Sequence, residues 1–259
     1  MAPAHTRPVL SCQDVEKIYG SRDNVTRALD GVSFDVAAGE YLAVMGPSGS
    51  GKTTMLNCVS TIDRPTSGHI YVDGQDITAL RAGQLSKFRR ERLGFVFQDS
   101  NLLDTLTARE NIALALTINH VPAKEVVARV TGVAQRLGVS EVLDKFPHEM
   151  SGGQKQRVAA ARAIVTDPSL VLADEPTGAL DSRNSRLLLE SLEDLNNAGA
   201  TIIMVTHDSF AASYARRALF LKDGRVWNEL FRGSKTRKQF FNEIMDVVSF
   251  LGGEGADVR

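Results

Sequence analysis

The chain has 259 residues, of which 43% are hydrophobic and 24% charged, values near the average for globular domains. This composition excludes a disordered, collagen-like or coiled-coil chain. Thirty Lys and Arg residues against 31 Asp and Glu residues give a formal net charge of −1, so no global field attracts nucleic acid or anionic lipid. We therefore expect no nucleic-acid partner, and any phosphate chemistry must be local.

No apolar stretch reaches the roughly 18 to 20 residues that span a bilayer, and the start MAPAHTRPVL lacks the apolar region of a signal peptide. We expect that the chain itself does not cross a membrane. The only two cysteines, Cys12 and Cys58, have no CxxC spacing, as expected of a reduced, cytosolic protein. Both are predicted to be small buried hydrophobes.

Short apolar runs alternate with helical patterns along the chain, which favours an α/β domain built on a mostly parallel sheet. Residues 9–19 and 32–36 alternate between apolar and polar side chains, as half-buried strands do. Residues 41–45 form an apolar run, followed by a glycine-rich turn and a helical pattern over about 51–60. The N-terminal part therefore predicts a β-rich layer and then a strand, a loop and a helix.

A helical region is predicted in the middle of the chain. Between about residues 99 and 147 strand patterns vanish, while 107–119 and 122–137 have helical periodicity. Apolar runs at 170–173 and 201–205 are typical of buried parallel strands, and a helix over 182–197 joins them. We therefore expect a helical insertion within a parallel-sheet core.

The C-terminal part is predicted to form a hairpin and then an amphipathic helix. Residues 222–224 (Lys-Asp-Gly) are typical of a hairpin turn. Apolar residues recur at helical spacing over 240–251, with Ser234 or Thr236 as alternative N-caps and glycines 252–253 at the end. We expect this helix either to pack on its own domain or to contact a second copy or a membrane partner.

The segment 46–53, GPSGSGKT, fits the phosphate-binding pattern GxxxxGK[ST] between a predicted strand and a predicted helix. Glycines let backbone N–H groups converge on phosphate oxygens, because a side chain would block the approach. The following helix adds the positive end of its dipole. Lys52 is expected to reach the β and γ phosphates, and Thr53 to ligate Mg²⁺ through its hydroxyl.

A second signal lies far along the chain, where the apolar run 169–173 ends in Asp174 and Glu175. Ligands bind beyond the carboxyl ends of the strands in open parallel sheets. We therefore place Asp174 as an Mg²⁺ ligand and Glu175 as the general base that polarises the attacking water. A solvated acidic turn is the alternative.

Residues 150–154, Met-Ser-Gly-Gly-Gln, precede a predicted helix and resemble the signature motif of ABC ATPases. The resemblance covers essentially residues 9–230, with the motifs in the family's order. The family signature usually opens with Leu, where this chain has Met150. Because this exchange conserves volume and costs under about 1.5 kcal/mol, we expect activity to survive.

The resemblance implies an α/β fold, that of a P-loop NTPase with an ABC-type antiparallel β subdomain, a parallel-sheet core, a helical subdomain insertion and a C-terminal helix. The ABC nucleotide-binding domain is then expected over 1–230. Within it, the core and β subdomain take 1–98 and 151–230, and the helical subdomain about 99–150. Residues 231–259 are expected to form an amphipathic helical extension.

The resemblance also assigns roles residue by residue. Tyr19 is expected to stack on adenine, Gln98 to contact Mg²⁺ and the water, and His207 to hydrogen-bond the γ-phosphate. Asp181 matches a loop that crosses the family's dimer interface. The catalytic set is then Glu175, His207, Gln98 and Lys52, and the metal set is Thr53, Gln98 and Asp174. The nucleotide-binding set is Tyr19, Gly46, Pro47, Ser48, Gly49, Ser50, Gly51, Lys52, Thr53, Thr54, Ser151, Gly152, Gly153, Gln154 and Asp181. Four histidines match no motif and are expected on the surface: His5, His69, His120 and His148.

The resemblance implies an ATPase that uses ATP and Mg²⁺ and works as a dimer of two copies. Ser151 and Gly153 of one copy are then expected to bind the γ-phosphate held by the other copy's Lys52. Because the chain has no predicted membrane span, a separate integral membrane permease is the expected partner, received at Gln98 and the helical insertion. The protein is thus expected at the cytoplasmic face of the cell membrane, held there through the permease.

The sequences GPSGSGKTT with Asn57, and EPTGALDS, are similar to those of the macrolide-export and lipoprotein-release branch. The tail over 229–253 resembles that of bacitracin-type antimicrobial-peptide resistance ATPases. This resemblance implies a role in peptide-antibiotic resistance. The alternatives are lipoprotein release, macrolide efflux, and a non-transport ABC ATPase that regulates cell-wall hydrolysis.

Overall fold

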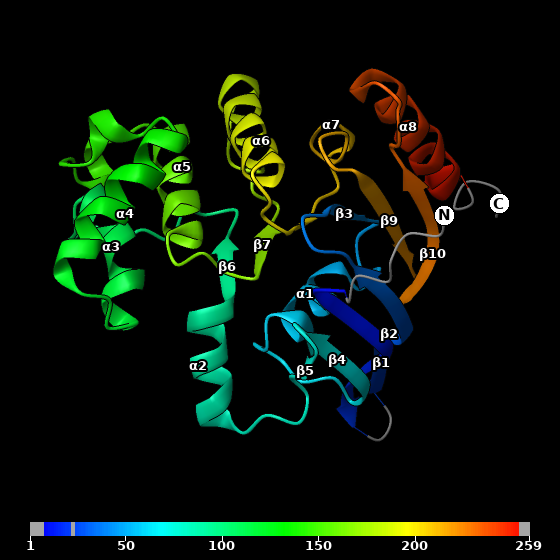
Figure 1. Cartoon of the computed structure of the whole chain (residues 1–259). Coiled ribbons are helices and arrows are strands. Elements are labelled where there is room, and N and C mark those ends of the chain that lie inside the picture. The colour runs from blue at the N-terminus through cyan, green and yellow to red at the C-terminus, as the bar shows by residue number, and fades with distance from the viewer. Residues whose placement is uncertain (1–7, 22–23, 254–259) are drawn as a thin grey trace, which may run out of the picture. The chain divides into compact units, whose positions relative to one another are not determined.

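The computed structural model describes residues 8–21 and 24–253, which divide into two units (Figure 1). Unit 1 combines the chain up to Arg81 with the chain from Thr201 onwards, and unit 2 is Ala82–Ala200. The loop at 46–53, called the phosphate loop below, belongs to unit 1. Residues 150–154, called the signature segment, belong to unit 2.

An antiparallel sheet of unit 1 has the strand order β2-β1-β4-β5. Its strands are β1 (Leu10–Ser21), β2 (Asn24–Val36), β4 (Ser67–Val72) and β5 (Gln75–Asp76). Along β2, Val32, Phe34 and Val36 are buried while the residues between them are exposed. The predicted β-rich layer is thus confirmed, since alternation puts one face of each strand against the core.

A set of parallel strands in unit 1 carries the phosphate loop. β3 (Tyr41–Met45) pairs in parallel with β8 (Ile202–Val205) and β9 (Arg217–Lys222). β10 (Arg225–Phe231) returns antiparallel to β9, which confirms the hairpin predicted at 222–224. Every residue of β3 and β8 is buried, and burial on both faces explains their unbroken apolar sequences.

The described residues of unit 1 also form three helices: α1 (Lys52–Val59), α7 (Ser209–Ala212) and α8 (Arg237–Gly253). α8 lies beside β10 and packs on it and on α7 through Phe240 and Ile244, both fully buried (Figure 1). Thr236, rather than Ser234, caps this helix. Its hydroxyl accepts from the Gln239 N–H (3.3 Å), and the Gln239 Oε1 accepts from the Thr236 N–H (2.9 Å). The C-terminal helix therefore packs on its own unit.

Unit 2 has two parallel strands and a group of helices. The strands are β6 (Leu93–Val96) and β7 (Leu170–Asp174). The helices are α2 (Ala82–Arg92), α3 (Ala108–Ile118), α4 (Ala123–Arg136), α5 (Gly152–Ile164) and α6 (Ser182–Asn197), with 3-10 turns η1 (Ser140–Val142) and η2 (Pro147–Glu149). α3, α4 and α5 pack against one another (Figure 1). The helices predicted over 107–119, 122–137 and 182–197 are confirmed.

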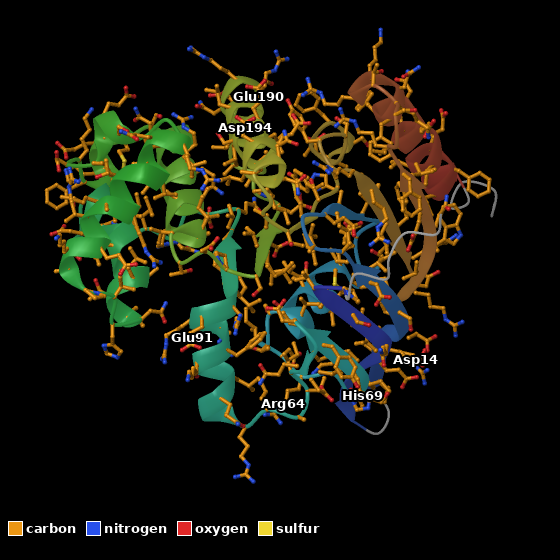
Figure 2. All side chains as sticks on the ribbon, in the orientation of Figure 1. Asp14, Arg64, His69, Glu91, Glu190 and Asp194 are labelled. Atoms are coloured by element: carbon orange, nitrogen blue, oxygen red, sulfur yellow. The ribbon has the colours of Figure 1, made fainter. Side chains whose placement is uncertain are left out.

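Local sequence explains where these helices begin and which face they bury. Thr107 and Glu110 form a capping box at the start of α3, and the hydrogen bonds from Thr107 hold the pKa of Glu110 below its usual value. In α6 the buried leucines recur at helical spacing, at 188, 189, 192 and 195. Glu190 and Asp194, labelled on α6 in Figure 2, lie on the opposite, exposed face.

Both cysteines are buried and free, as predicted, and burial raises the pKa of Cys58 to about 12. His120 and His148 are exposed, as predicted. His69, labelled in Figure 2, is exposed and pairs with Asp76 (2.9 Å), while His5 lies outside the described residues. Within residues 8–21 and 24–253, no helix combines the length and apolar character needed to cross a bilayer.

Candidate active site

The phosphate loop joins β3 to α1 in a conformation that requires glycine. Gly46, Gly49 and Gly51 have φ values of 147°, 79° and 101°, where L side chains are strained. Space is equally short. A Cβ on Gly46 would lie 2.2 Å from the carbonyl oxygen of Leu221, and one on Gly51 would lie 2.4 Å from that of Ala28. The chain therefore keeps its backbone uncovered where a phosphate would approach.

The polar groups of the loop suit an anion. Gly51 is the N-cap of α1 and makes no side-chain cap hydrogen bond, so the helix start offers its N–H groups and its positive dipole end. The Lys52 ammonium donates to the carbonyls of Gly46 (2.8 Å) and Pro47 (2.9 Å), which holds a positive charge over the loop. Beneath it, the buried hydroxyl of Ser50 makes no hydrogen bond. A bound phosphate group fits this arrangement because it would supply the missing negative charge and acceptors.

Two segments that are distant in sequence hold the phosphate loop in place, the turn between β9 and β10 and the strand β2. Sequence reasoning missed both. The hairpin turn between β9 and β10 donates from the Gly224 N–H to the Ser50 carbonyl (3.2 Å). The Gly224 carbonyl in turn accepts from the Asp30 N–H of β2 (2.8 Å), and Arg225 pairs with the Asp30 carboxylate (2.7 Å). The loop is thus fixed by backbone contacts to two strands distant in sequence.

Tyr19, the predicted adenine-stacking residue, stands on β1 with 40% of its surface exposed. Its hydroxyl donates to Asp63 (2.8 Å), and the Lys17 ammonium lies 4.8 Å from its ring centroid while also bonding Asp63 (2.6 Å). Partial burial and then the Asp63 hydrogen bond raise the pKa of the Tyr19 phenol. Because Lys17 covers one face of the ring, a base would stack on the other. Sequence reasoning missed Lys17 and Asp63, which no local motif marks.

His207 lies at the edge of the sheet from which the phosphate loop departs. β8 runs parallel to β3 with Val205 opposite Val44, and the Thr206 N–H donates to the Val44 carbonyl (3.1 Å). His207 follows immediately and is exposed. The strand register therefore confirms that unit 1 brings His207 and the phosphate loop to the carboxyl ends of adjacent strands.

The carboxylates of unit 2 also stand at a strand edge, beside Gln98. β6 and β7 are parallel, with Val96 opposite Ala173, so Gln98 and Glu175 each follow the end of a neighbouring strand. Glu175 has a φ of 44°, a left-handed conformation that costs a non-glycine residue about 1 to 2 kcal/mol. The Gly178 N–H donates to the Glu175 carbonyl (3.0 Å), which closes the turn. Strain of this kind is typical of functional positions.

Gln156 of α5 ties these two strand ends together, and sequence reasoning missed it. Its side-chain amide is buried and donates to the carbonyls of Phe97 and Pro176, the latter at 3.1 Å. Phe97 precedes Gln98, and Pro176 follows Glu175. One amide therefore fixes the backbone beside both predicted catalytic residues. In the sequence, the position of Gln156 just after the signature segment was the only signal for this role.

The signature segment and the Asp181 loop both begin helices of unit 2. Ser151 is the N-cap of α5 and forms a capping box with Gln154, at 3.3 Å and 2.9 Å. Asp181 is the N-cap of α6 and accepts from the Asn184 N–H (2.8 Å). That hydrogen bond and the one from the Asn184 side chain hold the pKa of Asp181 below its usual value.

The predicted site residues divide between the units. Unit 1 holds Tyr19, Gly46, Pro47, Ser48, Gly49, Ser50, Gly51, Lys52, Thr53, Thr54 and His207. Unit 2 holds Gln98, Ser151, Gly152, Gly153, Gln154, Asp174, Glu175 and Asp181. In the described part of the chain, no group of three or more His, Cys, Asp or Glu residues is arranged to hold a metal. Mg²⁺ needs no such cage, because in nucleotide sites it takes one or two protein oxygens plus phosphate and water. Thr53 and Asp174 offer hard oxygen donors of that kind.

Comparison with known proteins agrees with this geometry. A family model described as ABC transporter matches residues 29–178. The bacitracin export ATP-binding protein BceA of Halalkalibacterium halodurans is 47% identical over 95% of this chain and 97% of its own length. The macrolide export ATP-binding/permease protein MacB of Hyphomonas neptunium is 43% identical over 85% of this chain, which spans 34% of that relative.

Among solved structures, a dimeric post-hydrolysis state of the ATP-binding cassette MJ0796 of Methanocaldococcus jannaschii, bound to ADP and Pi, has a TM-score of 0.78. It is 38% identical and covers 86% of this chain and 98% of its own. Fold and site together define an α/β P-loop ATPase. The chain belongs to the ABC transporter family, as an ATP-binding subunit. ATP is its substrate, and Mg²⁺ is the standard metal of the family.

Proposed function

We propose that this chain powers the export of bacitracin-like peptide antibiotics, as two copies that act on a separate membrane permease. The proposal is supported most strongly by the bacitracin export relative, which matches 95% of this chain. The match to the macrolide export relative extends over less of the chain. A location at the cytoplasmic face of the cell membrane, held there through the permease, is part of the same proposal.

The residues divide the work of hydrolysis. Lys52 and the N–H groups of the phosphate loop hold the β and γ phosphates, and Tyr19 holds the base. Glu175 accepts a proton from the attacking water, while Gln98 and His207 orient the water and the γ-phosphate. Thr53 and Asp174 would hold Mg²⁺, which would neutralise charge on the phosphate oxygens. The turn at Glu175 is closed by the hydrogen bond from the Gly178 N–H to the Glu175 carbonyl, which fixes the backbone of this residue at the end of β7.

One copy is proposed to hold only half of each pocket. Ser151 and Gly153 stand at a helix start in unit 2 and are proposed to contact the γ-phosphate on the partner copy's Lys52. In a mixture of Lys52→Ala and Ser151→Arg proteins, each inactive alone, heterodimers have one intact pocket. ATPase activity should return to about a quarter of wild type, because half of the dimers are mixed. A mixture as inactive as its components would contradict the shared pocket.

The permease is proposed to dock on unit 2, in a cavity of about 280 Å³ between α2, β6, α3 and α5. Its lining includes Phe95, Phe97 and Ile118, and Ile118 is 46% exposed. Arg162 also lines it and donates to the carbonyls of Asn101 (2.7 Å) and Ser100 (2.9 Å), which holds the segment after Gln98. An apolar helix seated there would press on the strand end that carries Gln98. Unit 2 would thereby link the permease to the reaction.

The docking site is tested by Ile118→Glu, with Val127→Glu as the matched control. Val127 is 64% exposed on α4 and does not line the cavity. We expect Ile118→Glu to abolish co-purification with the permease and bacitracin resistance in cells, while ATPase activity of the isolated protein is kept. Val127→Glu should change neither. Equal loss in both variants would remove the cavity from the proposal.

Deletion of this chain from the same cells distinguishes the alternative functions. If the chain served macrolide efflux or lipoprotein release, deletion would leave bacitracin resistance unchanged and alter macrolide resistance or lipoprotein localisation. Regulation of cell-wall hydrolysis would appear as a division or lysis defect without any change in resistance. The macrolide export relative supports the first alternative through its identity over the ATP-binding part.

A further inference from the structure

Asn184 occupies the space between the starts of α5 and α6 in unit 2. It is the third residue of α6, and its backbone N–H donates to Asp181 Oδ1 (2.8 Å). Its side-chain Nδ2 donates to Asp181 Oδ2 (2.7 Å). Both carboxylate oxygens of Asp181 are therefore bonded to one residue, which fixes the direction of the Asp181 side chain.

The other end of the Asn184 amide faces the signature segment. A Cβ on Gly153 would lie 2.0 Å from Asn184 Oδ1, 2.3 Å from Cγ and 2.9 Å from Cβ, and no real Cβ approaches side-chain atoms so closely. Gly153 is buried and has no positive φ, so its backbone conformation is open to any residue. Glycine is needed at this position because Asn184 fills the space.

The neighbouring signature glycine has no such restriction. The nearest atom to a Cβ on Gly152 is Cδ2 of Leu180 at 3.9 Å, an ordinary contact. The close approach is thus specific to Gly153, and the amide of Asn184 spans from Gly153 to Asp181. Its orientation is determined, because only the NH₂ end can donate to the Asp181 carboxylate.

We propose that Asn184 is a positioning residue that makes the signature segment and the Asp181 loop move as one body toward the partner copy. The inference rests on the proposed shared pocket, since both segments are assigned to the dimer interface. With Asn184 in place, a shift of α5 at Gly153 pushes the side-chain amide, and the hydrogen bond from its Nδ2 carries the shift to Asp181. Nucleotide contact at the signature segment would thereby set the position of Asp181.

The test is a double-mutant cycle of Gly153→Ala and Asn184→Gly, with ATPase activity as the readout. Gly153→Ala alone should lower activity at least tenfold, because the new Cβ collides with Asn184, which both shifts the signature segment and displaces the amide from Asp181. Asn184→Gly alone should lower it about threefold to tenfold. In the Gly153→Ala background, Asn184→Gly removes the obstructing atoms and should raise activity at least threefold. If the two losses simply multiply, the coupling through Asn184 is wrong.

Arg186→Gly is the matched control. Arg186 lies on the same helix and is exposed, so this variant introduces the same glycine into α6 without the contact to Gly153. It should give no rescue of Gly153→Ala. A rescue of equal size by Arg186→Gly would show that loosening α6, rather than clearing the amide, restores activity, and would overturn the proposal.

A second readout separates positioning from loss of fold. In a Glu175→Gln background, Asn184→Gly should weaken ATP-dependent dimerisation about tenfold by light scattering, while the affinity of the monomer for a fluorescent ATP analogue is unchanged. Equal weakening of both would mean a purely structural role and overturn the inference. If Glu175→Gln alone forms no ATP-dependent dimer, the proposed function itself fails, which is a distinct result.

Discussion

The phosphate loop and the signature segment are both glycine-rich helix starts, but they differ in what their glycines face. In the phosphate loop, Gly46 and Gly51 have positive φ and lie against backbone carbonyls. In the signature segment, Gly153 has an ordinary helical backbone and lies against the side chain of Asn184. Similar glycine-rich sequences therefore serve two purposes. In the phosphate loop glycine permits the backbone conformation, and in the signature segment it makes room for a side chain.

The caps of the two helices differ in the same way. α1 begins at Gly51 with no side-chain cap, whereas α5 begins at Ser151 with a reciprocal capping box. A helix start without a side-chain cap leaves its N–H groups for a ligand, while a capping box satisfies two N–H groups within the chain, here those of Ser151 and Gln154. The phosphate loop is thus prepared for an anion by its backbone and by Lys52, whereas the start of α5 is stabilised by its own capping box.

The largest expected effect is on the hydrolysis step. It tests whether the general base lies at the end of β7 rather than in either helix start. Glu175→Gln should lower ATP hydrolysis by about 10²- to 10⁴-fold, the usual contribution of a general base. ATP binding should persist because neither helix start is altered. Phosphate release and binding of an ATP analogue, measured on the same preparation, check this. Near-normal hydrolysis would remove Glu175 from the role of base.

The next-largest effect tests whether the phosphate loop is enclosed by backbone atoms, which no side-chain substitution can remove. Gly51→Ala should weaken ATP binding by about 100-fold or more, because the residue has φ of 101° and a Cβ would meet the Ala28 carbonyl. Adding Ala28→Gly should give no recovery, since the obstructing oxygen belongs to the backbone. This contrasts with the rescue expected for Gly153→Ala. Recovery of ATP affinity in the Gly51 double variant would break the comparison.

A smaller effect concerns the two serines, whose removal should change stability in opposite directions. Ser151→Ala removes an N-cap and should lower the free energy of unfolding by about 1 kcal/mol. Ser50→Ala removes a buried hydroxyl without a hydrogen bond and should raise it by up to about 1 kcal/mol, while weakening ATP binding. Thermal unfolding without nucleotide provides the measurement. A loss of stability in Ser50→Ala would mean that its hydroxyl is satisfied within the protein.

The smallest effect concerns Asp63. Asp63→Asn should weaken ATP binding about threefold to tenfold, because the Tyr19 ring loses one of its anchors. Asp76→Asn, on the sheet that also carries Tyr19 but bonded to His69, is the control and should leave ATP affinity unchanged. Calorimetric titration with ATP compares the two. An equal effect of both variants would indicate a general loss of the sheet.

The contribution of the Asp63 carboxylate to stability should also depend on pH. Partial burial raises the pKa of Asp63, but hydrogen bonds from Lys17, Tyr19 and the Arg64 N–H outweigh it and leave the pKa below its usual value. A carboxyl with a lowered folded-state pKa stabilises the fold above its unfolded pKa of about 4, and loses this contribution as pH falls through the folded value. The difference in melting temperature between wild type and Asp63→Asn should therefore be present at neutral pH and shrink below about pH 4.

Much of the fold followed from local patterns, and the failures have local causes. The strand at Tyr41–Met45 and the helix at Ser182–Asn197 were predicted at their observed bounds, since an unbroken apolar run and a stripe of leucines are strong signals. No element was predicted over Ala82–Arg92, where α2 lies. That helix buries only Leu85 and Phe88 among many charged side chains, too few to give a periodic pattern.

The strand, glycine loop and helix start that are proposed to hold nucleotide could be predicted from the sequence, because each is a local feature formed by consecutive residues. The residues that hold these features in place could be found only in the folded chain. Gln156, Asp63, Gly224 and Asn184 act on partners brought near by strand pairing and helix packing. These contacts join segments that are remote in sequence. Their distances are set by packing in the folded chain, so the spacing of motifs along the sequence could not predict them.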